Sequence, residues 1–225
     1  MKRLALMLCT TLLSFNAFAL SLSDFSQQDT AVAMKEALTQ SARVAVSELG
    51  TPGGFSNNPD VRIELPGKLG SAARTLKMMG MGSQITALEN SMNAAAEAAV
   101  PQAETILVNA ISNMSLTDAK GIITGGNDSA TQYLERNSRE QIRALFLPSV
   151  KAATDQVGVA QQYNAFASQA AGFGVVDPSA TSVENYVTEK ALDGLFTMIA
   201  EQEASIRNDP AAAASSLARK VFGAL

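Results

Sequence analysis

Two sets of polar residues have the types and the spacing that chemistry or ligand binding would need. The first lies in an alanine-rich stretch, where carboxylates and amides share one face of a predicted helix: Glu89, Asn90, Asn93 and Glu97. Their oxygens are hard ligands of the kind that Ca²⁺ and Mg²⁺ prefer, and paired carboxylates can exchange protons with a substrate. The alternatives are a solvated face, or side chains that hydrogen-bond to a neighbouring helix.

The second set lies on the longest predicted helix, opposite its apolar stripe: Tyr186, Lys190, Asp193, Thr197 and Glu201. Lys190 and Asp193 are three residues apart and can pair on the helix surface. These side chains could come together with polar side chains of other helices to form a binding site. The candidate binding residues would then be Asn93, Glu97, Asp118, Tyr186, Lys190 and Asp193. If they do not converge, this is an exposed face on which each pair adds a few tenths of a kcal/mol. Gly194 inside this helix costs about 1 kcal/mol relative to Ala, which the close approach of another segment or of a ligand would explain.

Missing residue types exclude several classes of enzyme and metalloprotein. The 225 residues include no His and no Trp, and the one Cys, Cys9, lies in an N-terminal segment that we expect to be removed. Without Cys and His the mature chain cannot form a disulfide, use a thiol or imidazole, or hold zinc, haem or an iron–sulfur cluster through those ligands. No phosphate-loop or EF-hand spacing is present. We therefore expect no cofactor and no metal.

The N-terminus has the three parts of a secretory signal peptide. Lys2 and Arg3 precede an apolar run over 4–15, and an A-x-A box ends at Ala19. We predict cleavage after Ala19 and a periplasmic mature chain. The run is too short to span a membrane, and no second apolar run of spanning length follows. Loss of two basic residues changes the net charge from −4 to −6, which argues against a nucleic-acid partner.

Composition and periodicity predict an all-α, single-domain bundle of about eight to ten helices. Alanine dominates, and apolar residues recur at helical spacing between short Gly- and Pro-containing turns. The stretches that we expect to be helical are 30–49, 69–79, 83–99, 101–114, 115–124, 127–134, 138–150, 160–171, 181–208 and 210–222. One extended segment interrupts them, since apolar residues alternate with polar ones over 61–65.

The turn-rich stretch 50–66 is the best candidate for contact with a partner. It is longer than most loops, and its extended end could add to the edge of a partner's sheet. The alternative is a loop that folds down on the bundle and is anchored by Phe55.

Several segments together resemble one bacterial exported family, domain of unknown function 4197. They cover nearly the whole mature chain in order: Asn58–Pro66, Ser91–Pro101, Asp118–Gly125, Ala130–Tyr133, Tyr186–Phe196 and Ile206–Pro210. The resemblance implies an extracytoplasmic helical protein and brings no activity and no functional residues. Glu64 departs from the family pattern, in which a proline stands at this position.

These observations favour a non-enzymatic binding or interaction module whose partner is a protein or a small molecule of the cell envelope. The alternative is a carboxylate-dependent hydrolase acting on envelope glycans. It would need two carboxyl groups about 5 to 10 Å apart in a cleft. The carboxylates that could form such a pair are Glu89, Glu97, Asp118, Asp193 and Glu201.

Overall fold

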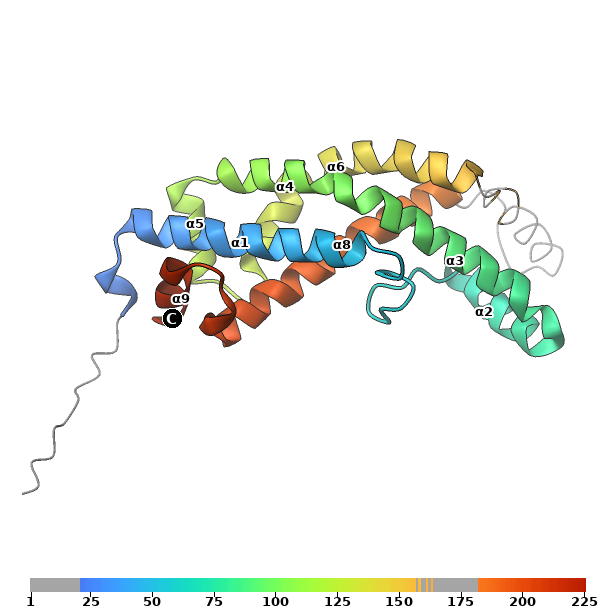
Figure 1. Ribbon diagram of the computed structural model, residues 1–225, viewed down its shortest axis with the longest axis horizontal. Coiled ribbons are helices and arrows are strands. Elements are labelled where there is room, and N and C mark those ends of the chain that lie inside the picture. The colour runs from blue at the N-terminus through green and yellow to red at the C-terminus, as the bar shows by residue number, and fades with distance from the viewer. Residues whose placement is uncertain (1–20, 157, 159–160, 162, 164–181) are drawn as a thin grey trace, which may run out of the picture.

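The computed structural model describes residues 21–156, 158, 161, 163 and 182–225 (Figure 1). The elements of the first half are η1 (Leu22–Asp24), α1 (Gln27–Leu49), α2 (Gly67–Leu76), η2 (Lys77–Met81), α3 (Gly82–Ala99), η3 (Val100–Gln102) and α4 (Ala103–Ser112). Those of the second half are α5 (Leu116–Ile123), α6 (Ser129–Gln156), α8 (Val183–Asn208), η4 (Pro210–Ala212) and α9 (Ser216–Phe222). The predicted signal peptide, and most of the helix expected over 160–171, lie outside the described residues.

Short polar side chains set where several helices begin. Ser26 accepts a hydrogen bond from the Asp29 amide and caps α1, so Asp29 is the third residue of this helix. Ser115 caps α5 in the same way through Asp118. Ser138 resembles a cap in sequence, but it is buried inside α6 and donates to the Leu134 carbonyl oxygen. The two helices expected over 127–134 and 138–150 are therefore one.

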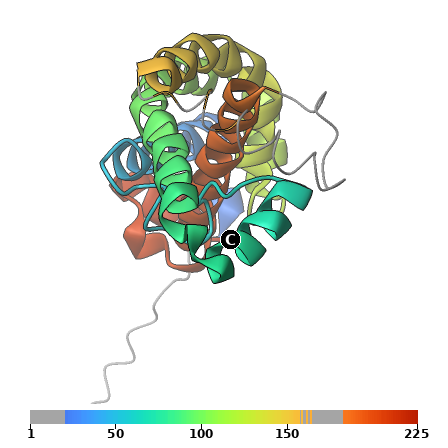
Figure 2. The same ribbon diagram turned by 90° about the vertical axis from the view of Figure 1, so that its right-hand side faces the viewer.

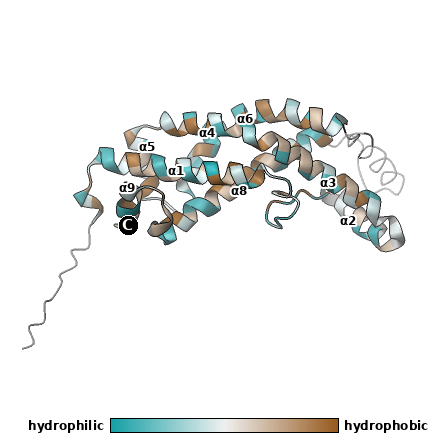
Figure 3. Cartoon of the chain, viewed as in Figure 1, coloured by the Kyte–Doolittle hydropathy of each residue, from teal (hydrophilic) through white to brown (hydrophobic). Residues whose placement is uncertain are grey.

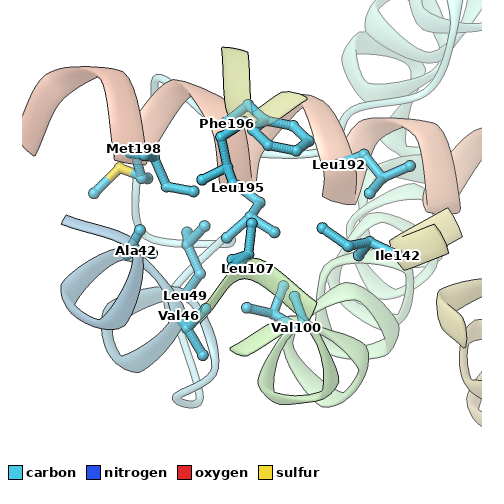
Figure 4. Close-up of a cluster of buried hydrophobic side chains, with 14 of the residues drawn as sticks. Ala42, Val46, Leu49, Val100, Leu107, Ile142, Leu192, Leu195, Phe196 and Met198 are labelled. Carbon is cyan, nitrogen blue, oxygen red and sulfur yellow. The ribbon is translucent and has the colours of Figure 1, made fainter. Parts of the chain in front are cut away.

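The core forms where α1, α3, α4, α6 and α8 meet. α8 packs against α6, α1 and α3, and α1 also contacts α4, α5 and α9. Figure 2 views this bundle from one end. The close-up in Figure 4 shows aliphatic and aromatic side chains from four of these helices, together with Val100 of η3, pointing toward one another. Small residues such as Ala42, which is fully buried, let the helices approach closely.

A hairpin made of α2, η2 and the first half of α3 projects from one end of this bundle (Figure 1). The principal contacts of α2 are with η2 and α3, so this helix is supported mainly by its own hairpin. The chain reverses at Gly80, whose φ of 92° lies in the left-handed region that favours glycine. Met78, beside this turn, is 82% exposed.

The predicted all-α, single-domain bundle is confirmed. If α2 and α3 are counted as one helix through η2, the described residues form seven helices, slightly fewer than eight to ten. Figure 3 shows hydrophobic and hydrophilic residues alternating along the long helices, as expected for helices with one buried side. No helix within the described ranges is long and apolar enough to cross a membrane.

Candidate functional site

The stretch 50–66 is packed on the bundle and anchored by Phe55, as the alternative interpretation predicted. Phe55 is fully buried. A Cβ atom added at Gly194 of α8 would lie 2.7 Å from Phe55 Cε1 and 3.2 Å from Val61 Cβ. The close approach of this loop therefore explains the glycine inside α8. The sequence had suggested the close approach of either another segment or a ligand.

Asn93 of α3 holds the extended part of the loop as a neighbouring strand would. Its Oδ1 accepts a hydrogen bond of 2.9 Å from the Ile63 amide, and its Nδ2 donates to the Ile63 carbonyl oxygen at 2.8 Å. Val61, Ile63 and Leu65 are buried, whereas the residues between them are exposed. The predicted alternation is confirmed, but the segment forms no strand, since a side chain supplies the partner.

Two further candidate residues fasten the same loop. Glu97 Oε1 accepts hydrogen bonds from the backbone amides of Phe55 (3.1 Å) and Ser56 (3.3 Å). The Tyr186 hydroxyl donates to the Glu64 carbonyl oxygen at 2.8 Å. Burial, and then the nearby groups that include the Glu64 carboxylate, raise the pKa of Tyr186 to about 12. The phenol therefore stays protonated at neutral pH and acts as a donor that holds the loop.

Lys190 and Asp193 belong to a charged network between α6 and α8, centred on Arg139. The predicted pair is confirmed, with Lys190 Nζ 3.0 Å from Asp193 Oδ2. Arg139 contacts Glu135 at 2.7 Å, Glu189 at 2.9 Å and Asp193 at 2.7 Å. The side chains of Lys190 and Asp193 are 45% and 46% exposed. The pair is thus on the surface, and its partner from another helix is a basic residue that the sequence patterns did not indicate.

The basic residues of this network lower the pKa values of its carboxyl groups. Arg143 extends the network, since its Nε is 2.6 Å from Glu189 Oε1 and its Nη2 donates to Asn185 Oδ1 at 3.3 Å. Partial burial alone would raise the pKa of Asp193, but hydrogen bonds and charge from Arg139 and Lys190 outweigh it and lower the pKa. The pKa of Glu189 is lowered in the same way by the two arginines.

Replacing Arg139 with Met should lower the free energy of unfolding by about 1 kcal/mol at neutral pH, because these pairs are partly exposed. The change should also weaken the acid dependence of stability. In the folded chain the pKa values of Glu189 and Asp193 lie below their usual values of 4.5 and 3.8. The contribution of these two carboxyl groups to the free energy of unfolding is therefore full above their usual pKa values. It is lost as the pH falls through their pKa values in the folded chain.

Urea unfolding at neutral and at acid pH measures both effects. Lys190→Met is the matched control and should cost under about 0.5 kcal/mol, because it removes one exposed pair. Parallel pH profiles for the wild type and Arg139→Met would show that Arg139 does not set these pKa values.

Asp118 lies apart from the other candidates. Its carboxylate accepts hydrogen bonds from the Ser115 hydroxyl (2.6 Å) and backbone amide (3.2 Å). These bonds lower the pKa of Asp118, and a longer contact from the Tyr133 hydroxyl, at 3.4 Å, adds to the effect. Asp118 therefore acts as a helix-capping residue, and no hydrogen bond or ion pair among the described residues joins it to the other five candidates.

The remaining carboxylates proposed for a hydrolase occupy separate settings. Glu89 is buried beside Lys77 Nζ (2.8 Å) and Arg62 Nη2 (3.7 Å), and Glu201 is exposed on α8. Within the described residues, different neighbours engage Glu89, Glu97, Asp118 and Asp193. None of these contacts joins two of the five carboxylates to each other. Across the same residues, no group of three or more acidic side chains lies close enough to hold a metal ion.

A buried ion pair near the end of α8 was not predicted. Glu203 accepts hydrogen bonds from the amides of Ala130 (3.0 Å) and Thr131 (2.8 Å), at the start of α6. Its partner Arg207, at 2.9 Å, donates to the carbonyl oxygens of Ile122 (3.0 Å) and Ile123 (3.1 Å) at the end of α5. One ion pair thus bonds to backbone groups at both helix ends of the α5–α6 connection.

The hollows on the described surface include the two that follow. In the first, several of the polar side chains already form hydrogen bonds or an ion pair within the protein. The first, about 470 Å³, lies beside α1 near Lys35, Gln40 and Arg43. Lys35 and Gln40 are bonded to backbone groups of other segments, and Arg43 pairs with Glu104 at 3.2 Å. The second, about 280 Å³, lies between residues 22–30 and the end of α5.

The fold and these contacts define a helical bundle in which many of the clustered polar residues fasten its own segments. The chain belongs to the family described as Protein of unknown function (DUF4197), whose model matches residues 24–223. The resemblance noted from the sequence is thereby confirmed. Neither a curated protein nor a solved structure was found to match the chain.

Proposed function

We propose that this protein is an exported, non-enzymatic interaction module of the cell envelope, and that the hairpin of α2, η2 and α3 is its contact element. The bundle acts as a stiff support, since its loop 50–66 and the turn between α5 and α6 are fastened by buried side chains. The loop 50–66 was our first candidate for the contact. Its large apolar side chains are buried in the core, so they do not face a partner.

The observation that carries the proposal is that α2, among the described residues, is supported mainly by its own hairpin. Most helices of a bundle bury one side against several others, whereas α2 has its principal contacts with η2 and α3. Met78 at the turn is the most exposed of the large hydrophobic residues described. A projecting hairpin with an exposed methionine at its turn is suited to contact with another molecule, because methionine adapts its shape to varied surfaces.

In-cell photo-crosslinking tests whether the hairpin is a contact element. A photoreactive residue, p-benzoylphenylalanine, replaces Met78 in one variant and Leu145 of α6 in the control. Both positions are exposed large hydrophobics, at 82% and 44%. We expect a discrete adduct of protein or lipid from position 78 and none above background from position 145. Equal labelling from both positions, or none from position 78, would contradict the proposal.

Export with cleavage after Ala19 is a separate prediction. Lys2, Arg3 and the apolar run that follows are lost if a signal peptidase acts at the A-x-A box. Intact-mass spectrometry of the protein from the envelope fraction should then give a chain that begins at Leu20. A mature species that retains Lys2 and Arg3 would refute cleavage at this position.

A further inference from the structure

We infer that the hairpin tip binds the surface of an anionic phospholipid membrane. This inference rests on the proposed function and names the partner of the same contact element. The tip is defined as residues 74–81, which comprise the end of α2 and the whole of η2.

The charge of the hairpin is opposite to that of the rest of the chain. Between Glu64 and Glu89 the sequence contains three basic residues, Lys68, Arg74 and Lys77, and no acidic one. All 21 acidic residues therefore lie outside this segment. Lys77 pairs with Glu89, so the hairpin remains positive even when that carboxylate is counted. A basic segment on an acidic protein is attracted to an anionic surface that repels the body.

The shape of the molecule lets this segment reach a surface first. The hairpin lies at one end of the long axis (Figure 1). The next acidic residue along α3 is Glu97, two turns beyond Glu89 and bonded to the loop 50–66. Charges farther away than a Debye length of about 8 Å are largely screened at physiological salt. Acidic residues beyond this distance therefore have little influence at the tip.

The exposed methionine at the turn fits a lipid interface better than a protein interface. Met78 is 82% exposed. A stable protein–protein interface takes about 20 to 30 residues from each partner, whereas the tip comprises only residues 74–81. A membrane instead receives a small apolar tip among its headgroups, while nearby basic residues contact anionic lipids.

Sedimentation of the purified mature protein with vesicles tests the inference. We expect binding to phosphatidylglycerol-containing vesicles, weaker binding at high salt, and none to phosphatidylcholine vesicles. Arg74→Gln should reduce the partition about fivefold. Met78→Ser should reduce it about three- to tenfold. Arg136→Gln and Leu145→Ser, at exposed positions on α6, are the matched controls and should leave it unchanged. Circular dichroism checks that each variant is folded.

Equal binding to both vesicle types, or tip variants that bind like the wild type, would overturn the inference. Absence of vesicle binding would do so too. If position 78 then still yields a protein adduct in cells, the contact element stands and its partner is a protein. If position 78 yields no adduct at all, the proposed function fails as well.

Discussion

Replacing Arg207 with Met should lower the free energy of unfolding by about 3 to 5 kcal/mol, because Glu203 is then left as a buried charge without its partner. The side chains of Arg207 and Glu203 are only 6% and 4% exposed. The same change removes the donor of the Ile123 carbonyl oxygen and one of the two donors of the Ile122 carbonyl oxygen, which keeps the Gly125 amide. It also removes a contact in which the guanidinium lies 5.7 Å from the Phe222 ring centre, on α9.

Chemical denaturation of matched variants isolates the effect of burial. Lys151→Met removes a cation from another i, i+4 pair, with Asp155, whose side chains are 62% and 50% exposed, and should cost under about 0.5 kcal/mol. Adding Glu203→Gln to Arg207→Met should cost less than the sum of the two single changes, since no buried charge remains. A loss below about 1 kcal/mol for Arg207→Met would contradict the role given to this pair.

Phe55→Ala should cost about 3 to 5 kcal/mol, because it empties a fully buried site between the loop 50–66 and α8. Gly194→Ala should cost about 1 to 3 kcal/mol, because the new Cβ would lie 2.7 Å from Phe55 Cε1 and push the loop outward. The two changes should couple. Removal of the Phe55 ring frees the space that a Cβ at position 194 needs, so the double variant should be less destabilised than the sum.

A second glycine provides the control for helix propensity. Gly121 lies inside α5, and a Cβ added there would have no heavy atom within 4 Å. Gly121→Ala should therefore stabilise the protein by up to about 1 kcal/mol, opposite in sign to Gly194→Ala. Strict additivity of Phe55→Ala and Gly194→Ala in urea unfolding would show that the loop does not press on Gly194.

Local patterns predicted those features that depend on nearby residues. The helical class followed from alanine content and apolar spacing, and the Lys190–Asp193 pair from their separation of three. The alternation over 61–65 also correctly predicted which side chains are buried. Each of these properties is set within one or two turns of a helix or within a few residues of extended chain.

Features that join distant segments could not be predicted in the same way. Asn93 and Glu97 share a helix face in the sequence, but nothing there indicates that the face meets a loop some 30 to 40 residues away. The sequence around Arg139 likewise does not indicate that this residue pairs with Glu189 and Asp193 of α8. The burial of Glu203, in contrast, could have been predicted from the sequence. It lies four residues after Ile199 and three before Ile206, within an apolar stripe of the helix. A carboxylate at such a position indicates a buried partner.

Hydrogen exchange measured by mass spectrometry, with and without membrane vesicles prepared from the cell envelope, tests the central claim that the hairpin is the contact element. We expect slower exchange over 67–88 when the vesicles are present, and unchanged exchange in α1, α6 and α8, which form the supporting bundle. The readout does not depend on whether a lipid or a protein makes the contact. Protection confined to the α6–α8 surface around Arg139, with 67–88 unchanged, would contradict the claim.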